Sequence, residues 1–422
     1  MMKRVKPKNE FRQNVLTLMT GSTVAQAIPI VISPMLTRIY TPADFGVFSL
    51  FVAIVGFISV VSSARYEQAL LVPADDKDAI NIFALGFLIN AFMSIFLFLV
   101  IAMLSKEIAN LFNNKEIETW LWFAPLTIFF IGLFNLLTYW NNRKKHYANI
   151  TKATIIKSII LAISQIVIGT IKSGAAGLVG GQILSSIFSN MRLAKALLNN
   201  KKLLKLISKE SMMNQAKKYI NFPKFQAPHA MLNNLSSNVP TFLFSVFFGS
   251  NIVGFYALAT RIVLAPLGIL SNASAKVYNQ KVSELYNNNE DTYAFTIRFL
   301  KAFIKKIILP LTAIVIFAPT IFEFVFGENW REAGVYTQIL FPWILLNLVV
   351  STISFIPSLV GMQKKILKVS IVLIILTSLS IYIGIKIGNV YTSLIFFTIS
   401  NCLVLGYNII WILKVLQCRE IK

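Results

Sequence analysis

The fold of this chain is decided by the stretch from residue 79 to residue 104, which reads AINIFALGFLINAFMSIFLFLVIAML. It contains no charged side chain, and its polar residues are few and scattered. A helix needs about 20 mostly apolar residues to cross the hydrocarbon core of a bilayer. The stretch is therefore long enough to predict a membrane-spanning helix, and the same test applies along the rest of the chain.

The composition of the whole chain agrees with a protein built from such helices. Of its 422 residues, 56% are hydrophobic and 14% are charged, whereas soluble domains are about 45–50% apolar and about 25% charged. These values exclude an ordinary soluble enzyme, and the high hydrophobicity excludes a disordered chain. The sequence predicts an all-α membrane protein with about twelve transmembrane helices. Their expected ranges are 14–37, 43–64, 79–104, 119–140, 150–171, 174–195, 227–249, 252–273, 302–323, 334–358, 366–387 and 390–413.

The charge distribution predicts the orientation of these helices. The net charge of +23 would indicate a nucleic-acid partner in a soluble protein. Here almost all of the basic excess falls in the segments on one side of the predicted spans, and the segments on the other side are close to neutral. Cytoplasmic loops carry such an excess of Lys and Arg. We therefore expect both termini in the cytoplasm and no nucleic-acid partner.

The chain is predicted to consist of two halves. Residues 1–195 form an N-terminal six-helix bundle, residues 196–225 a basic cytoplasmic linker, and residues 226–422 a C-terminal six-helix bundle. Gly46–Leu50 (GVFSL) and Gly254–Leu258 (GFYAL) open the second span of each half, which suggests a duplication into parallel repeats, a known transporter plan. No segment outside the membrane is long enough to fold a catalytic domain.

Four cationic side chains are candidates for binding an anionic substrate. Arg261 lies about 15 Å into its predicted span, near mid-bilayer, where a charge is costly and should face a cavity or a partner. Arg38, Arg65 and Lys276 lie at the ends of related spans. Together they predict a cationic track lining a wet cavity. The alternative for Arg261 is a structural pairing with carbonyls or a buried carboxylate, and for the other three it is contact with lipid headgroups.

Amide side chains are concentrated in the first and seventh predicted spans, where they could line a hydrophilic cavity for sugar hydroxyls. The alternative is hydrogen bonding between helices, which is common in membranes. Prolines in the same spans should bend them. The amides assigned to the site are Gln26, Asn233, Asn234 and Asn238, and the prolines are Pro29, Pro34 and Pro240.

No cofactor, metal site or catalytic residue is expected. The acidic run Asp75-Asp76-Lys77-Asp78 could suggest Mg²⁺ binding. It directly precedes a predicted span, however, where carboxylates cap a helix N-terminus and interact favourably with its dipole. The sequence contains no phosphate-binding loop, serine-hydrolase elbow or zinc-protease motif, so ATP-driven transport by this chain is unsupported.

Five short strings resemble bacterial polysaccharide-export flippases of the Wzx type. They are LTRIYTPADFG (36–46), ARYEQAL (64–70), NFPKF (221–225), NNLSSNVP (233–240) and GFYALATR (254–261). The resemblance implies the fold of the multidrug/oligosaccharidyl-lipid/polysaccharide superfamily, in which two six-helix bundles flank a central cavity and alternate between inward- and outward-facing states. It also implies that Arg38, Arg65, Arg261 and Lys276 attract a diphosphate, although lysine lacks the bidentate fork of arginine.

The implied function is that of a flippase in the bacterial inner membrane. It would move an undecaprenyl-diphosphate-type oligosaccharide from the cytoplasmic to the periplasmic leaflet for O-antigen or capsule synthesis. Expected partners are membrane lipids, a polysaccharide polymerase and glycosyltransferases. The alternatives are a multidrug or organic-cation antiporter of the same superfamily, a membrane-embedded polysaccharide polymerase or ligase, and a flippase for a peptidoglycan or teichoic-type precursor.

Overall fold

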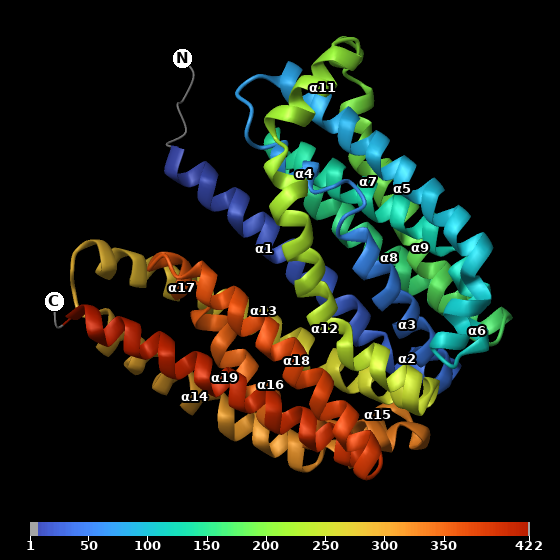
Figure 1. Ribbon diagram of the computed structural model, residues 1–422, viewed down its shortest axis with the longest axis vertical. Coiled ribbons are helices and arrows are strands. Elements are labelled where there is room, and N and C mark those ends of the chain that lie inside the picture. Colours follow the sequence, from blue (N-terminus) through green and yellow to red (C-terminus); the bar gives the residue numbers. More distant parts are fainter. Residues whose placement is uncertain (1–6, 421–422) are drawn as a thin grey trace. The chain divides into compact units, whose positions relative to one another are not determined.

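The computed structural model describes residues 7–420, and these residues form helices and turns with no strand (Figure 1). The chain divides into two compact units, Met1–Asn238 and Val239–Lys422. The helices of unit 1 are α1 (Pro7–Val31), α2 (Ser33–Ile39), α3 (Pro42–Ser59), α4 (Tyr66–Ala69), α5 (Asp76–Leu111), α6 (Lys115–Leu121), α7 (Ala124–Arg143), α8 (Tyr147–Ile171), α9 (Ala176–Leu198), α10 (Lys201–Leu204) and α11 (Lys209–Lys218). Helix α12 (Ala227–Phe248) contains the boundary between the units.

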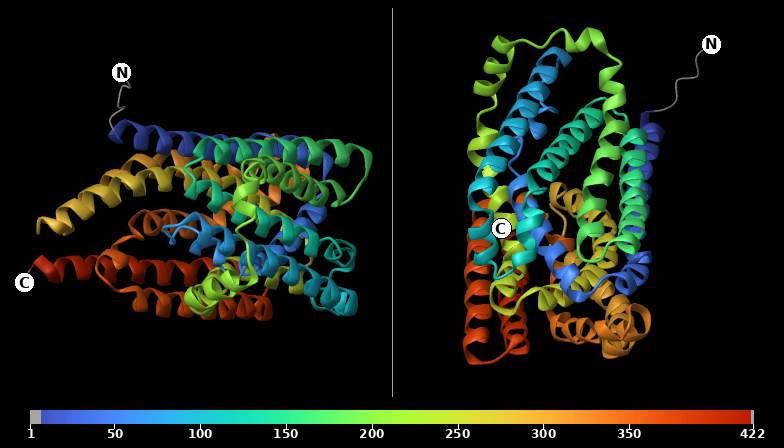
Figure 2. Two further views of the ribbon diagram at one scale, coloured as in Figure 1. Left: turned by 90° about the horizontal axis from the view of Figure 1, so that it is seen from above. Right: turned by 90° about the vertical axis from the view of Figure 1, so that its right-hand side faces the viewer.

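Unit 2 contains the remaining helices, several of which are long. They are α13 (Ser250–Asn287), α14 (Thr292–Ile316), α15 (Ala318–Phe326), α16 (Arg331–Ile353), α17 (Ile356–Leu359), α18 (Gln363–Ile387) and α19 (Val390–Glu420). Within this unit α13 packs along α16, and α18 packs along α19. Figure 2 shows these helices, coloured yellow to red, running alongside one another.

The predicted all-α membrane fold is confirmed. Every predicted span coincides with helix over most of its length, and within residues 7–420 nine helices are long and apolar enough to cross a membrane, or ten if the bent pair α14–α15 counts as one span. The two other predicted spans, over α9 and α12, are helical but less apolar. Helix α9 carries several serines and amides, and α12 carries three asparagines. The number twelve and the cytoplasmic position of both termini remain predictions.

Prolines flank a break in the first predicted span. Helix α1 ends at Val31 and α2 begins at Ser33, and Pro29 and Pro34 lie on either side of this break. The Ser33 hydroxyl donates a hydrogen bond to the Pro29 carbonyl, 2.6 Å away, which gives a partner to a backbone group near the break. The predicted bend at these two prolines is therefore confirmed as a break, whereas α12 continues through Pro240.

The predicted span 302–323 is divided by a sharp bend. Helices α14 and α15 meet at Phe317 with an angle of 67° between their axes. Pro319 lies in the first turn of α15, where its missing N–H costs nothing and its ring fixes a helical φ. Pro319 therefore favours the start of a new helix at this point. The hydropathy of the segment does not reveal the bend.

The basic segment between the two predicted bundles packs against unit 1. Asn81 of α5 donates to the carbonyl of Leu206 at 3.0 Å, and it accepts from the backbone N–H of Ser208 at 2.9 Å. Ser208 in turn caps α11 by accepting from the N–H of Ser211. A single buried amide therefore fixes the start of α11 on α5. The predicted boundaries 1–195, 196–225 and 226–422 remain predictions.

Each unit has its own apolar core. In unit 1, Tyr66, Leu70, Ile80 and Trp140 join α4, α5 and α7, and the rings of Phe83 and Trp140 meet edge to face. In unit 2, Tyr278, Val349, Ile353 and Trp411 join α13, α16 and α19. Large apolar side chains are also exposed in a row on α5, as the lipid-facing side of a membrane helix requires. They include Phe92, Ile95, Phe96, Leu99 and Met103.

The closest helix packing in unit 1 depends on a glycine. Gly177 of α9 lies against α8, where a Cβ atom would overlap the Tyr40 hydroxyl and lie 2.8 Å from the backbone nitrogen of Gly169. The Tyr40 hydroxyl donates to the carbonyl of Gln165 at this crossing. Small residues allow membrane helices to approach in this way, because van der Waals contact replaces the hydrophobic effect inside a bilayer.

We predict that Gly177→Ala destabilises the protein by about 1–3 kcal/mol, because backbone atoms cannot move aside cheaply. Gly406→Ala in α19 is the matched control, since nothing lies within 4 Å of its added methyl group. Thermal unfolding in detergent, followed by tryptophan fluorescence, measures both variants. Equal midpoints for Gly177→Ala and the unchanged protein would show that this packing is not needed.

Candidate substrate-binding site

Arg65 of unit 1 is held in a strained turn beside a buried carboxylate. Ala64 and Arg65 have φ values of 50° and 63°, in a left-handed region that non-glycine residues seldom adopt. The Arg65 guanidinium lies 3.3 Å from the Glu67 carboxylate, whose side chain is 3% exposed, while the Arg65 side chain is 23% exposed. Ser63 donates to the other oxygen of Glu67. Part of the charge of Arg65 is therefore balanced within its own turn.

Glu67 is a residue that the sequence reasoning missed. No role is predicted for it from the sequence, whereas the structure buries it almost completely next to Arg65. Its position two residues after Arg65 was the available signal. A buried carboxylate needs a partner, and Arg65 and Ser63 supply one.

One amide side chain of α12 lies close to a glycine of α3. A Cβ atom at Gly56 of α3 would lie 3.8 Å from Nδ2 and 3.9 Å from Oδ1 of Asn234. Asn238 donates from its amide nitrogen to the backbone carbonyl of Asn234 at 2.9 Å and to its side-chain oxygen at 3.0 Å. Asn234 and Asn238 therefore lie next to each other, and the side-chain amide of Asn234 lies close to the backbone of α3 at Gly56.

The other predicted site residues of unit 1 are exposed. Gln26 lies on α1, Arg38 in the last turn of α2 and Asn233 on α12, and all three side chains face away from the core of the unit. A cation in the last turn of a helix interacts favourably with the helix dipole, which is one role of Arg38. In the described part of unit 1, no hydrogen bond or ion pair joins these three to another predicted site residue.

Both predicted cations of unit 2 lie on the long helix α13. Arg261 is partly buried, and Lys276 is exposed. Arg261 lies about 16 Å from the start of the helix, and Lys276 is about 22 Å further along and roughly 60° away around the axis. Pro266 lies between them and removes one backbone hydrogen bond of the helix. Arg261 is the only charged residue between Ser250 and Ala275.

The acidic run before α5 forms a salt bridge, and no metal-binding group of three ligands occurs in the residues that the structure describes. Asp75 takes the N-cap position without a capping hydrogen bond, and Asp76 lies in the first turn. Asp76 pairs with Arg143, 3.1 Å away, and with Lys144. The predicted position of the acidic run at a helix start is confirmed, but the N-cap side chain makes no capping hydrogen bond, and Asp76 forms a salt bridge instead.

Arg143 connects this salt bridge to the preceding turn. Its guanidinium donates to the carbonyls of Leu70, Pro73 and Ala74 at 3.1, 2.6 and 3.0 Å. The side chain is only 10% exposed, so it acts as a structural clamp between the end of α7 and the start of α5. Lys157 of α8 places its ammonium 4.5 Å from the centre of the Phe134 ring of α7.

The sequence around Arg261 differs from the surroundings of Arg65 and Arg143. Arg65 and Arg143 have carboxylate or carbonyl partners in unit 1. Arg261 lies in a stretch of α13 with no other charge. Such an arrangement can attract an anion into an apolar environment. The assignment of Gln26, Arg38, Arg65, Asn233, Asn234, Asn238, Arg261 and Lys276 to one site remains a prediction.

Comparison with known sequences identifies the kind of protein that this chain resembles. Residues 35–335 match the model of the polysaccharide biosynthesis protein family. An uncharacterized membrane protein in the cps region of Klebsiella pneumoniae is 23% identical over 301 residues, which cover 70% of this chain. The matched part spans 60% of the length of that relative.

Solved structures show the same fold. An inward-facing multidrug resistance MATE family transporter of the MOP superfamily has a TM-score of 0.74 at 16% identity, covering 95% of both chains. The lipid II flippase MurJ in an inward closed conformation has a TM-score of 0.72 at 13% identity, covering 96% of this chain and 90% of MurJ. At these identities the likeness concerns the fold alone.

The ion pair between Arg65 and Glu67 can be tested for its contribution to stability. We predict that Arg65→Ala destabilises the protein by about 2 kcal/mol, because Glu67 would stay buried without its cation. Arg38→Ala, which removes an exposed arginine from the last turn of α2, should lower the thermal midpoint in detergent less than Arg65→Ala does, because an exposed helix-dipole interaction is weaker than a buried ion pair. The double variant Arg65→Ala/Glu67→Gln should regain part of the loss. If Arg65→Ala melts like the unchanged protein, the ion pair does not stabilise the turn.

Proposed function

Since this chain belongs to the polysaccharide biosynthesis protein family, we propose that it moves a polyprenyl-diphosphate-linked oligosaccharide from the cytoplasmic to the periplasmic leaflet. The chain is a multi-pass protein of the bacterial inner membrane with the fold of the MOP superfamily. The Wzx-type resemblance of its sequence is confirmed by the family match. The proposal adds the substrate, the direction of movement and the residues that bind it.

The single observation that carries the proposal is the position of Arg261. It is a cation partway along a spanning helix, in a stretch from Ser250 to Ala275 that contains no other charge. A diphosphate cannot enter hydrocarbon without a replacement for its hydration. The planar guanidinium of arginine can donate two parallel hydrogen bonds to phosphate oxygens. A cation at this depth therefore suits an anionic headgroup that must cross the membrane.

The amides of α12 suit the sugar part of such a substrate. Asn234 and Asn238 are already joined to each other, and Asn233 is exposed beside them. Amide groups both donate and accept hydrogen bonds, as sugar hydroxyls do. In this proposal these residues and Gln26 bind the oligosaccharide, while Arg38, Arg65, Arg261 and Lys276 attract the diphosphate.

Two comparisons support this choice of substrate class. The Klebsiella relative is described as a membrane protein in a cps region, and MurJ, whose fold this chain shares, is described as a lipid II flippase. The proposal also includes two helix bundles, residues 1–195 and residues 226–422, joined by the linker 196–225. The two bundles alternate between an inward-facing and an outward-facing state. Glycosyltransferases would supply the substrate, and a polymerase would use it after transfer.

The distribution of acidic residues argues against export of organic cations. Such a substrate needs a carboxylate within the membrane interior to bind its charge. In the described spanning helices the acidic residues lie near helix ends, as Asp44, Asp76 and Glu332 do, or are paired in turns, as Glu67 is. The predicted segments outside the membrane are also too short for the domain of a polymerase.

We predict that Arg261→Gln lowers transport about tenfold to a hundredfold, because it removes a charged hydrogen bond worth about 1.5–3 kcal/mol. The measurement is surface polysaccharide in the native host with its chromosomal copy deleted and each variant expressed at equal level. Lys281→Gln is the matched control, since Lys281 lies on the same helix and is exposed beside Glu284. Arg261→Lys should retain partial activity.

Full export by Arg261→Gln would contradict the role of this cation in substrate binding. If deletion of the chain leaves polysaccharide unchanged but raises sensitivity to cationic drugs, the proposed substrate class is wrong. If the deletion strain accumulates lipid-linked oligosaccharide on the cytoplasmic side, the proposal is supported.

A further inference from the structure

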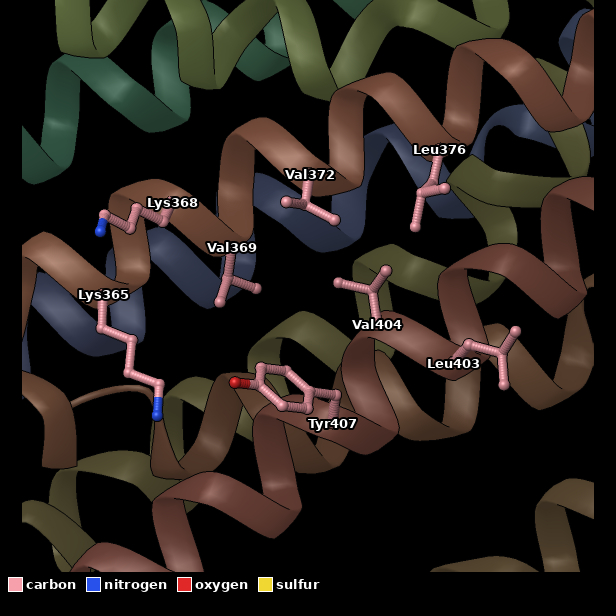
Figure 3. A pocket seen from close by; sticks show the side chains of 8 residues that line it. All are labelled: Lys365, Lys368, Val369, Val372, Leu376, Leu403, Val404 and Tyr407. Carbon is pink, nitrogen blue, oxygen red and sulfur yellow. The ribbon is translucent and has the colours of Figure 1, made fainter.

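Unit 2 contains an open groove between its last two long helices. Side chains of α18 and α19 enclose a volume of about 750 Å³. Figure 3 shows Val369, Val372 and Leu376 of α18 directed toward α19. The facing residues of α19 are Leu403, Val404 and Tyr407, and the remaining lining residues are Lys365 and Lys368.

The groove has a cationic end and an apolar end. Lys365 and Lys368 lie at one end, and Tyr407 together with valine and leucine side chains lines the rest (Figure 3). Several apolar side chains along it are exposed, among them Val372, Leu376 and Leu403. A molecule that fits this surface has an anionic group at one end and a hydrocarbon chain at the other.

The ammonium group of Lys365 is held in place by aromatic rings. It lies 4.4 Å from the centre of the Trp411 ring and 5.9 Å from that of Tyr407. The indole N–H of Trp411 donates to the side-chain oxygen of Asn408 at 2.8 Å, which fixes the ring. Lys368 is exposed at the same end of the groove, so its ammonium adds a second cation there.

The stretches of α18 and α19 that line the groove contain no acidic residue. The sequence has no acidic residue between Ala333 and Arg419, a range that covers all of α18 and nearly all of α19. A cationic pair between membrane helices at a cytoplasmic surface attracts anionic lipid headgroups. The positive-inside pattern predicts that the end of α18 with Lys365 and Lys368 is cytoplasmic.

The length of the groove agrees with one leaflet. From Lys365 to Leu376 the rise along α18 is about 16 Å, and half of the hydrocarbon core of a bilayer is about 15 Å. An acyl chain that starts at the lysines would therefore extend along the whole lined surface toward the middle of the membrane.

We propose that this groove binds one phospholipid with a net anionic headgroup from the leaflet at the lysine end. The headgroup phosphate lies between Lys365 and Lys368, and one acyl chain packs against Val369, Val372, Leu376 and Val404. A second copy of the chain fits less well, because a symmetric interface apposes the same patch on both copies and would bring two lysine pairs together. The proposal is independent of the substrate proposed above.

Native mass spectrometry of the purified full chain tests the headgroup. We expect tighter binding of phosphatidylglycerol than of phosphatidylethanolamine with the same acyl chains. Lys365→Gln/Lys368→Gln should weaken phosphatidylglycerol binding about 30-fold, at about 1 kcal/mol for each cation. Lys386→Gln is the matched control, because Lys386 lies at the other end of α18 with its ammonium 5.8 Å from the ring centre of Tyr382.

A second measurement locates the lipid without any substitution. Phosphatidylglycerol with a photoreactive acyl chain should crosslink to peptides that contain residues 369–376 and 403–407. Equal binding of the two lipids, full binding by the double variant, crosslinks confined to other helices, or a dimer that covers these residues would each overturn the proposal.

Discussion

The hydrocarbon core of a bilayer offers no hydrogen-bond partners, and the architecture of this chain depends on that constraint. Backbone groups within the membrane must be satisfied internally, and the described residues accordingly form helices and turns. Where a helix is interrupted, a local side chain supplies a partner, as Ser33 does for the Pro29 carbonyl. Charged groups inside the membrane are subject to the same constraint, because each needs a counter-charge, a polar surface or water.

Three arginines differ in their surroundings, and the difference bears on function. Arg65 and Arg143 follow the ends of predicted spans, whereas Arg261 lies within one. Arg143 is saturated by Asp76 and three backbone carbonyls, so it stabilises the fold and has little capacity left for a ligand. Arg65 is intermediate, since Glu67 balances part of its charge but its side chain stays partly exposed. Arg261 lies in an otherwise uncharged stretch of its helix, and we propose that the diphosphate binds there.

Much of the fold could be predicted from the sequence, because spanning a bilayer leaves a strong pattern of apolar runs between basic loops. All twelve predicted segments are helical. The bend between α14 and α15 was not predicted, since hydropathy does not record helix direction. The site was less predictable. The pairing of Arg65 with Glu67 depends on a left-handed turn at Ala64 and Arg65, and the groove at Lys365 depends on how α18 and α19 pack. Neither is encoded in a local pattern.

The central claim is that positive charge within the membrane-spanning helices recognises the diphosphate of a lipid-linked glycan. It is tested most directly by reconstituting the unchanged protein in proteoliposomes with two labelled glycolipids. Both carry the same prenyl chain and sugars, and only one contains the diphosphate. The account predicts that the diphosphate lipid changes leaflet in a protein-dependent way and that the neutral lipid does not. Equal translocation of the two lipids would contradict it.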